Sequence, residues 1–445
     1  MEQVASEPKN PYRDDFLVGL RSRRNEPVWL LERRQAALAA FERLGLPGKR
    51  WEAWRNLDLT PIADNRFPLL HTWGEIDDAT VEAALGDVPD VYRMVFVDGF
   101  VSAGHSALEG LPSGAVVLSL DEAMDAENPA LERLGQAERT QQEPFLALNT
   151  AFMGDVALIH LGKGVVLDKP VVIVNLMSTK AEGRGVYPRT LVVAEEGAQA
   201  SVVELFRSNT ADAYLNVPVT EFYLDANAHI SNYRVQEEGG EAFHLATVLA
   251  RLERDATFTL HTLAVGGKTA RTDIHVDLEG KGAEAELDGL YLAGDGQYVD
   301  HHTWVHHNTE HCNSRQRFKG VLDGKSETVF DGLVRVAPGA QKTDARQENR
   351  NLVLSPRGLA HSNPRLEIHA DDVKCSHGST TGELDREALF YMRARGIGER
   401  DAQALLTFAF VNEMLDTVRL EALKEYEREL ILRWLPGDET VREIQ

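Results

Sequence analysis

A cysteine and a histidine two residues apart are the clearest candidates for metal chemistry in this sequence. Cys375 and His377 lie in the segment HADDVKCSHG, and alternate side chains of an extended strand share one face. Strand geometry separates them by about 7 Å, close enough to line one site but too far to chelate a small ion unaided. Thiolate and imidazole suit iron or zinc, so the pair predicts a metal site that a partner surface completes. The alternative is that both residues only pack in the protein. The side chains predicted to share this face are those of His369, Asp371, Val373, Cys375 and His377.

A second group of metal-binding residue types lies in the segment HHTWVHHNTEHC. Its members are His301, His302, His306, His307, His311 and Cys312. Strand alternation would place His302 and His306 on one face and His301 and His307 on the other. A single compact tetrahedral zinc site is therefore not implied, and we expect surface histidines.

Two cysteines, Cys312 and Cys375, are present in the whole sequence. A disulfide framework is therefore excluded, and at most one bridge could form. A cluster held by four cysteines of this chain alone is excluded as well, because the ligands are too few.

Motifs of several common enzyme classes are missing. The sequence contains no GxxxxGK[ST] phosphate loop, no HExxH and no GxSxG. ATP hydrolysis by this chain is not expected. A polysaccharide-active β-helix enzyme with paired acids in a groove is one alternative, although the acidic residues are mostly dispersed at turns. A self-contained metal-binding homodimer that associates through an unpaired strand edge is another.

Short Val-, Ile- and Leu-rich runs alternate with turn residues from about Gly154 for over 200 residues, which predicts strands. A short motif recurs at spacings of 28, 30 and 27 residues, with alanines at Ala198, Ala226, Ala256 and Ala283 and a weaker match at Gly339. This period is typical of a solenoid whose coils bury their inner faces by stacking. The sequence therefore predicts a mainly β protein with a right-handed parallel β-helix core over residues 151–382.

Helical patterns flank this core. Apolar residues at helical spacing predict a helix from Glu26 to Leu46, within an N-terminal helical and mixed domain of residues 1–150. Asp385 is expected to cap a helix that Gly396 ends, and one longer helix is expected from Arg400 to about Leu435. These two helices form a C-terminal helical domain, residues 383–445.

The charge balance limits the partners. With 47 Lys and Arg against 70 Asp and Glu, the formal net charge of −23 disfavours nucleic acid. The segment Met1 to Asn10 is polar, and no run reaches the roughly 18 apolar residues of a membrane span. We therefore expect a cytoplasmic protein without membrane attachment.

Three long segments resemble the SufB/SufD family, and its SufD branch more closely. They are DVKCSHGSTTGELDREALFYMRARGI, TWVHHNTEHCNSRQRFKGVLDGKSETVFDGLVRV and KTDARQENRNLVLS, with a weaker match in EPVWLLERRQAALAAFERLGLP. The resemblance implies the same β-helix with helical ends, and a scaffold subunit of a SufBCD complex that is not an enzyme by itself.

The resemblance also implies partners and site residues. The β-helix would pair with SufB, and the C-terminal helices would bind the ATPase SufC through Leu389, Phe390, Tyr391 and Arg393. His377 would face SufB at the site of the nascent iron-sulfur cluster, with Cys375 beside it, and SufB would supply the missing ligands. The cluster would be held transiently, no cofactor would stay on the isolated chain, and flavin binding by the complex is left open. Cys312, in a family-like context, could contact sulfur or metal.

Overall fold

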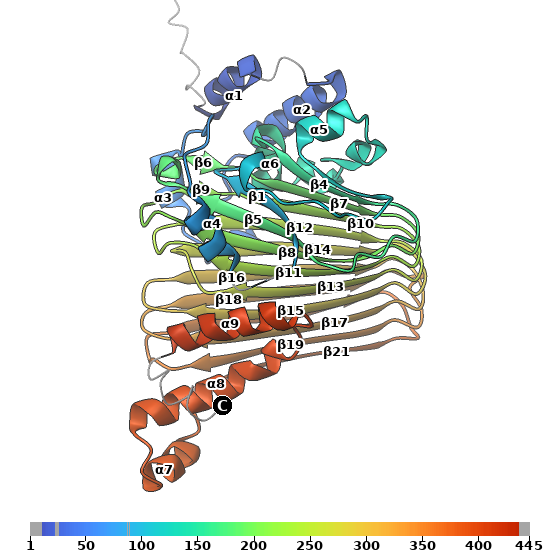
Figure 1. The fold of residues 1–445 in the computed structure, drawn as a ribbon. Coiled ribbons are helices and arrows are strands. Elements are labelled where there is room, and N and C mark those ends of the chain that lie inside the picture. The colour runs from blue at the N-terminus through green and yellow to red at the C-terminus, as the bar shows by residue number, and fades with distance from the viewer. Residues whose placement is uncertain (1–10, 23–25, 87, 89, 436–445) are drawn as a thin grey trace, which may run out of the picture.

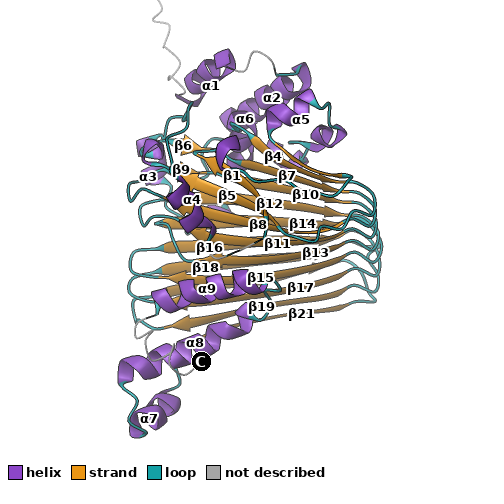
Figure 2. Ribbon diagram, viewed as in Figure 1, coloured by secondary structure: helices purple, strands orange, loops and turns teal. Residues whose placement is uncertain are grey.

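The computed structural model describes residues 11–22, 26–86, 88 and 90–435. Two parallel sheets stack face to face along most of the chain, with helices gathered at both ends (Figure 1). Strand dominates over helix, which confirms the predicted fold class (Figure 2). Within the described ranges, no helix combines the length and the apolar character needed to cross a membrane.

Consecutive strands of the solenoid alternate between the two sheets. The first sheet has the order β2 (Phe100–Val101), β1 (Tyr92–Val97), β5 (Val171–Met177), β8 (Gln199–Ser208), β11 (His229–Glu237), β13 (Thr257–Ala264), β15 (Glu284–Ala293), β17 (Asn313–Leu322), β19 (Asp344–Val353) and β21 (Lys374–Gly382). We call it sheet 1. Neighbours pair in parallel, except that β2 runs antiparallel to β1. Each coil therefore gives one strand to each sheet.

The opposite sheet, sheet 2, follows the same rule. Its order is β20 (Leu359–Ile368), β18 (Glu327–Val336), β16 (Tyr298–His307), β14 (Thr269–Leu278), β12 (Phe243–Leu252), β10 (Val219–Leu224), β7 (Arg189–Ala194), β4 (Val156–Leu161) and β3 (Ala115–Leu118), with β6 (Gly185–Val186) and β9 (Leu215–Asn216) beside this path. The strand β3 is antiparallel to β4. The boundary at residue 150 stays a prediction, but β1 and β3 show that the two sheets begin before it.

Tight turns set the period of the solenoid. Residues with φ between 55° and 77° recur every 27 to 31 residues, at Gly197, Asn227, Asp255, Gly282, His311 and Lys342. A small side chain follows each of the first five and is fully buried: Ala198, Ala228, Ala256, Ala283 and Cys312. The predicted repeat is thus confirmed, but its register is wrong at two places. Ala228 rather than Ala226 is the repeat alanine, and Lys342 rather than Gly339 continues the series, because the left-handed residue defines the turn.

The core lies between the two sheets. Inward side chains of the two sheets meet across it, with Phe222 of β10 against Phe258 of β13 at 4.9 Å and Phe318 of β17 against Phe330 of β18 at 4.8 Å between ring centroids. Stacking of the coils buries the inner face of each coil only when its neighbours are present.

Helices cover the outer faces. The N-terminal elements are α1 (Pro11–Ser22), α2 (Val28–Leu44), η1 (Glu52–Trp54), α3 (Thr60–Asn65), α4 (Asp78–Leu85), η2 (Ala103–His105), α5 (Leu120–Asp125), η3 (Pro129–Arg133), η4 (Glu138–Gln141) and α6 (Pro144–Phe152), and η5 (Thr179–Ala181) follows β5. The predicted helix at residues 26–46 is confirmed as α2, which packs on α6 and ends at Gly45 with φ 68°. The helix α4 lies on β5 and β8 of sheet 1.

The C-terminal segment forms α7 (Arg386–Ala394), α8 (Glu399–Leu415) and α9 (Glu421–Trp434). As predicted, Asp385 caps α7, its carboxylate accepting from the N–H groups of Glu387 and Ala388. The single long helix predicted from Arg400 is wrong, because the chain turns between α8 and α9. Thr417 Oγ1 donates to Met414 O at 2.7 Å, and such a local side-chain bond competes with continuation of a helix.

Candidate functional site

The last coil of the β-helix is open. The strands β20 and β21 end the two sheet orders, and neither has a further strand partner among the described residues. Most side chains of β21 are exposed and none of β20 is fully buried, in contrast to β19, where buried residues alternate along much of the strand. The end of the solenoid therefore presents two free strand edges and the rim of its interior.

Backbone groups along this rim are unused. Lys374 donates its N–H to Thr343 O, at the side of β19. Because alternate residues direct their backbone groups to opposite edges, the N–H groups of Cys375, His377, Ser379 and Thr381 face the free edge. On β20, His369 and Leu359 donate toward β18, so Pro364 has its ring nitrogen at the free edge, where a missing N–H costs no ladder bond.

Cys375 and His377 lie on β21 and share its inward face, as predicted. They are in register with Ala345 and Gln347 of β19, both of which are buried. Cys375 is half-buried and packs on the apolar interior, whereas His377 is exposed. Burial, together with the charge of Asp344, raises the pKa of the Cys375 thiol. A metal ion in contact with the sulfur would reverse this effect by favouring the thiolate.

The predicted extension of that face is wrong for His369 and Asp371 and right for Val373. His369 and Asp371 are exposed in the turn between β20 and β21, where strand alternation does not apply. Val373, just before β21, packs on the same apolar interior as Cys375. The predicted site itself, Cys375 and His377, is unaffected.

Behind these two residues the interior of the last coils is polar. Gln316 accepts a hydrogen bond from Thr303 Oγ1 at 2.6 Å and another from Gln347 Nε2 at 3.2 Å. Beside them, Tyr291 Oη donates to Asn351 at 2.8 Å. Sequence reasoning missed these residues. Their signal is the alternating Gln347, Asn349 and Asn351 in DARQENRNLV, where an apolar inner face would be expected.

The histidine cluster is divided between two environments, as strand alternation predicts. His301 and His307 point into the solenoid, and His302 and His306 point out of it under the N-terminal region. The prediction of surface histidines is wrong for His301, His302 and His307, which are buried, whereas His311 is exposed. Burial lowers the pKa of His301 and of His307 to about 4. In the described ranges no group of three or more His, Cys, Asp or Glu side chains could hold a metal ion.

Cys312 lies inside the molecule and away from Cys375. Two strand spacings, about 10 Å along the solenoid axis, separate the coil of β17 from that of β21. Cys312 is fully buried, its Sγ lies 3.4 Å from Gly280 O, and burial raises the pKa of its thiol. Its position is that of the repeat alanines, which gives it a packing role; a sulfur or metal contact at Cys312 stays a prediction.

The residues predicted to bind an ATPase lie on α7, which extends beyond the β-helix and contacts α8 (Figure 1). Phe390 and Tyr391 are 74% and 60% exposed. Leu389 is half-buried, and Arg393 pairs with Glu399 at 3.3 Å. No residue of α7 is buried, so this helix presents an apolar surface that the described part of the chain leaves uncovered.

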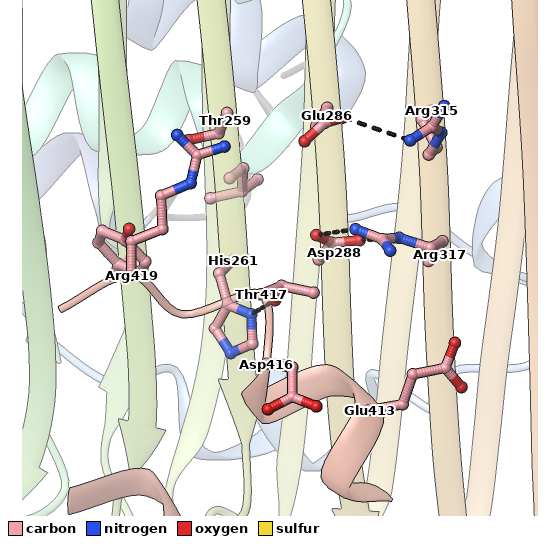
Figure 3. A pocket seen from close by; sticks show the side chains of 12 residues that line it. Thr259, His261, Glu286, Asp288, Arg315, Arg317, Glu413, Asp416, Thr417 and Arg419 are labelled. Carbon is pink, nitrogen blue, oxygen red and sulfur yellow. Dashed lines mark hydrogen bonds and ion pairs between the residues drawn. The ribbon is translucent and has the colours of Figure 1, made fainter. Parts of the chain in front are cut away.

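A polar pocket of about 380 Å³ lies between sheet 1 and the turn that joins α8 to α9 (Figure 3). His261 Nδ1 lies 2.9 Å from Thr417 Oγ1, and its Nε2 lies 2.9 Å from Glu427. Because Glu427 more than compensates for burial, the pKa of His261 is raised. These contacts fix the C-terminal helices on the sheet.

A polysaccharide-active enzyme, the alternative considered above, would need paired acidic residues in a pocket such as this one. Each carboxylate of the pocket already has a cationic partner. Asp288 pairs with Arg317 at 2.8 Å, and the other pairs are Glu286 with Arg315, Glu413 with Lys319 and Asp416 with Lys424. One of these pairs, Glu413 with Lys319, ties α8 to the sheet, and carboxylates neutralised in this way are poorly suited to acid–base catalysis.

Comparison with known proteins gives two matches to family models. A model described as the SufBD protein N-terminal region matches residues 22–173, and one described as SUF system FeS cluster assembly, SufBD core domain, matches residues 176–410. The iron-sulfur cluster assembly protein SufD of Escherichia coli K12 is 34% identical over 91% of this chain and 92% of its own length. An iron-sulfur cluster assembly SufBD family protein of Synechocystis is 31% identical over 90% of each chain, and SufD of Bacillus subtilis is 24% identical over 92% of this chain and 95% of its own.

Proposed function

Because the chain belongs to the SufBD family and acts in iron-sulfur cluster assembly within the SUF system, we propose that it is a non-catalytic scaffold subunit of a SufBCD complex. Its β-helix pairs with SufB, and its C-terminal helices bind the ATPase SufC. The observation that carries this proposal is the open last coil, where two free strand edges frame Cys375 and His377. A cytoplasmic location belongs to the same proposal.

Pairing with SufB is supported by the chemistry of the rim. A row of free N–H groups on β21 can bond a strand of a second β-helix, because edge addition uses main-chain hydrogen bonds. The polar interior behind the rim, including Gln347 and Asn349, would then be enclosed by the partner. A second copy of this chain could use the same edge, so the isolated chain is expected to dimerise weakly.

The shared boundary is also where the nascent cluster would be held. Cys375 and His377 offer two ligands, and an iron-sulfur cluster bound by protein takes about four. SufB supplies the remainder, so the cluster is transient cargo and no cofactor stays on the isolated chain. A two-ligand half-site is consistent with the lack of a larger metal-binding group in the described part of the chain.

Binding of SufC is supported by α7. Phe390 and Tyr391 project from a short helix that is anchored, through α8, to the β-helix. Aromatic side chains with a neighbouring charge, here Arg393, are typical anchors of protein interfaces. Leu389 directly precedes Phe390 in the sequence and extends the apolar surface.

The test is co-expression with SufB and SufC, followed by anaerobic purification. His377→Ala is expected to abolish cluster absorbance and iron content while the complex still assembles. His361→Ala is the matched control, because His361 is also exposed on a terminal strand but points out of the solenoid toward Glu327. Normal clusters with His377→Ala would contradict the site assignment.

A substitution on α7 tests the binding of SufC separately from the binding of SufB. Phe390→Ala is expected to weaken SufC binding at least about fivefold and to leave SufB binding unchanged, since truncating an interface anchor costs over about 1 kcal/mol. Binding of each partner is measured by calorimetry. If the chain binds neither partner and retains stoichiometric metal by itself, the metal-binding homodimer replaces the scaffold.

A further inference from the structure

A cavity of about 140 Å³ lies between the outer face of sheet 2 and the N-terminal region, away from the open end of the solenoid. Its floor comes from β12, β14 and β16, and its roof comes from η1 and the start of α6. The lining includes Thr247, Arg271, Asp273 and Trp304 below and Trp51, Trp54, Glu143 and Phe145 above. The cavity thus brings together segments about 90 to 250 residues apart in the sequence.

Three indole rings form its walls. Trp304 stacks on His275, with 4.3 Å between centroids and 8° between planes. Trp54 is buried and packs on Phe145 at 5.2 Å. Trp51, 37% exposed, lies at the mouth. Two of the three walls are therefore fixed by their neighbours before any ligand arrives.

Two carboxylates, Glu143 and Asp273, line the cavity beside one guanidinium, that of Arg271. Arg271 is buried and is shared between two carboxylates, at 2.8 Å from Asp273 and 2.8 Å from Asp300. Glu143 Oε1 lies 3.1 Å from His275, but its Oε2 is buried without a hydrogen-bond partner among the described residues. Although burial opposes them, its cationic neighbours, His275 first, lower the pKa of Glu143, so this carboxylate is held ionised and can accept a hydrogen bond from a cation.

Arg271 is itself a planar cation that packs against one of these indole rings. Its guanidinium carbon lies 3.8 Å from the centroid of the Trp54 ring, and Nη1 donates to Ala53 O at 2.6 Å. A flat cation over an indole face is attracted by the ring quadrupole, most strongly where water is excluded. A cavity of roughly this volume, about 150 Å³, can hold a benzene ring.

We propose that this cavity binds a small planar organic cation of the amidinium or guanidinium class. The flat group lies among the indoles of Trp51, Trp54 and Trp304, and its N–H groups donate to Glu143 Oε2 and to Asp273. A bidentate cation–carboxylate contact of this kind is both strong and geometrically selective. The site is independent of the proposed pairing with SufB, because it uses no residue of β20 or β21.

The test is titration of benzamidine into the full-length chain, followed by calorimetry and by tryptophan fluorescence. We expect saturable binding at one site per chain and a change in indole emission. Benzoate, which has the same shape and the opposite charge, is expected not to bind. Lack of saturable benzamidine binding, or equal binding of benzoate, would overturn the proposal.

Two variants locate the site. Glu143→Gln keeps the size of the side chain and is expected to weaken benzamidine binding by about tenfold, the usual loss for one charge-assisted hydrogen bond. Trp73→Phe is the matched control, because Trp73 is exposed and does not line the cavity, and its affinity should equal that of the wild type. Circular dichroism of Glu143→Gln checks its fold. An unchanged affinity in a folded Glu143→Gln protein would contradict the assignment.

Discussion

The two ends of the β-helix are built in opposite ways. At the N-terminal end, β2 and β3 run antiparallel to their neighbours, and helices cover the outer faces of the first coils. At the C-terminal end, β20 and β21 continue the parallel ladders and then stop, with their edges free. A solenoid needs a cap or a partner at each end, since a bare end exposes both backbone and core. Under the proposed function, the covered end serves stability and the open end serves assembly.

The interior becomes polar well before the open end. The inward side chains Phe96, Ile173 and Val192 of the first coils are apolar. Glu204 on β8 already points inward, where it pairs with Arg234, and the last coils continue with Gln316 and Gln347, which bond one another. Water can reach the open rim at low cost only if the groups there are polar.

The largest expected effect comes from breaking the closed end. Phe96→Ala removes a fully buried ring from the first coil and should lower the free energy of unfolding by about 3–5 kcal/mol. Thr381→Ala, at an exposed inward position of β21, should change it by less than about 0.5 kcal/mol. Urea unfolding followed by circular dichroism measures both. Equal losses would mean that the two ends contribute alike to stability.

A smaller effect is expected in the pH dependence of the free energy of unfolding, to which the buried polar interior should contribute and the exposed rim should not. The pKa of His307 is lowered to about 4 by burial, with His306 adding to the effect, whereas an unfolded histidine titrates near 6.5. The unfolded state therefore binds more protons between these values, and stability is lost as the pH falls from 6.5 toward 4. At pH 4.5 the loss in the free energy of unfolding due to His307 is about 2 kcal/mol.

The comparison of wild type with His307→Gln isolates that contribution, since other groups titrate in both proteins. The variant should lose about 2 kcal/mol less than the wild type between pH 7 and 4.5, measured by urea unfolding at each pH. His361→Gln, on the exposed outer face of β20, should lose as much as the wild type. Parallel curves for wild type and His307→Gln would show that the interior is already hydrated.

The smallest expected effect tests whether the free edge is used. Ser379→Pro removes an N–H that faces the unpaired edge and leaves the ladder to β19 intact. The free energy of unfolding of the isolated chain should change little, while the affinity for SufB should fall by about fivefold, since a lost hydrogen bond costs roughly 1 kcal/mol. Calorimetry with purified SufB measures this. Thr380→Pro, whose N–H points toward β19, should instead destabilise the chain itself, and the reverse pattern would refute the assigned edge.

Local sequence rules determined much of this protein. A solenoid is specified by a turn residue every 27 to 31 positions and by strands of alternating side chains, because each coil has the same turn and stacks on its neighbours in the same way. The shared face of Cys375 and His377 follows from the same alternation, since it depends only on two neighbouring positions of one strand. The helix cap at Asp385 is equally local.

Only the tertiary structure decided which faces are covered. Alternation separates His301 from His302 but cannot say that one is enclosed by the next coils and the other by an N-terminal segment more than 150 residues earlier. The break between α8 and α9 depends likewise on His261 of a distant strand, which meets Thr417 at the turn. Whether a side chain is buried depends on contacts between distant segments, so the residue pattern within one segment does not predict it.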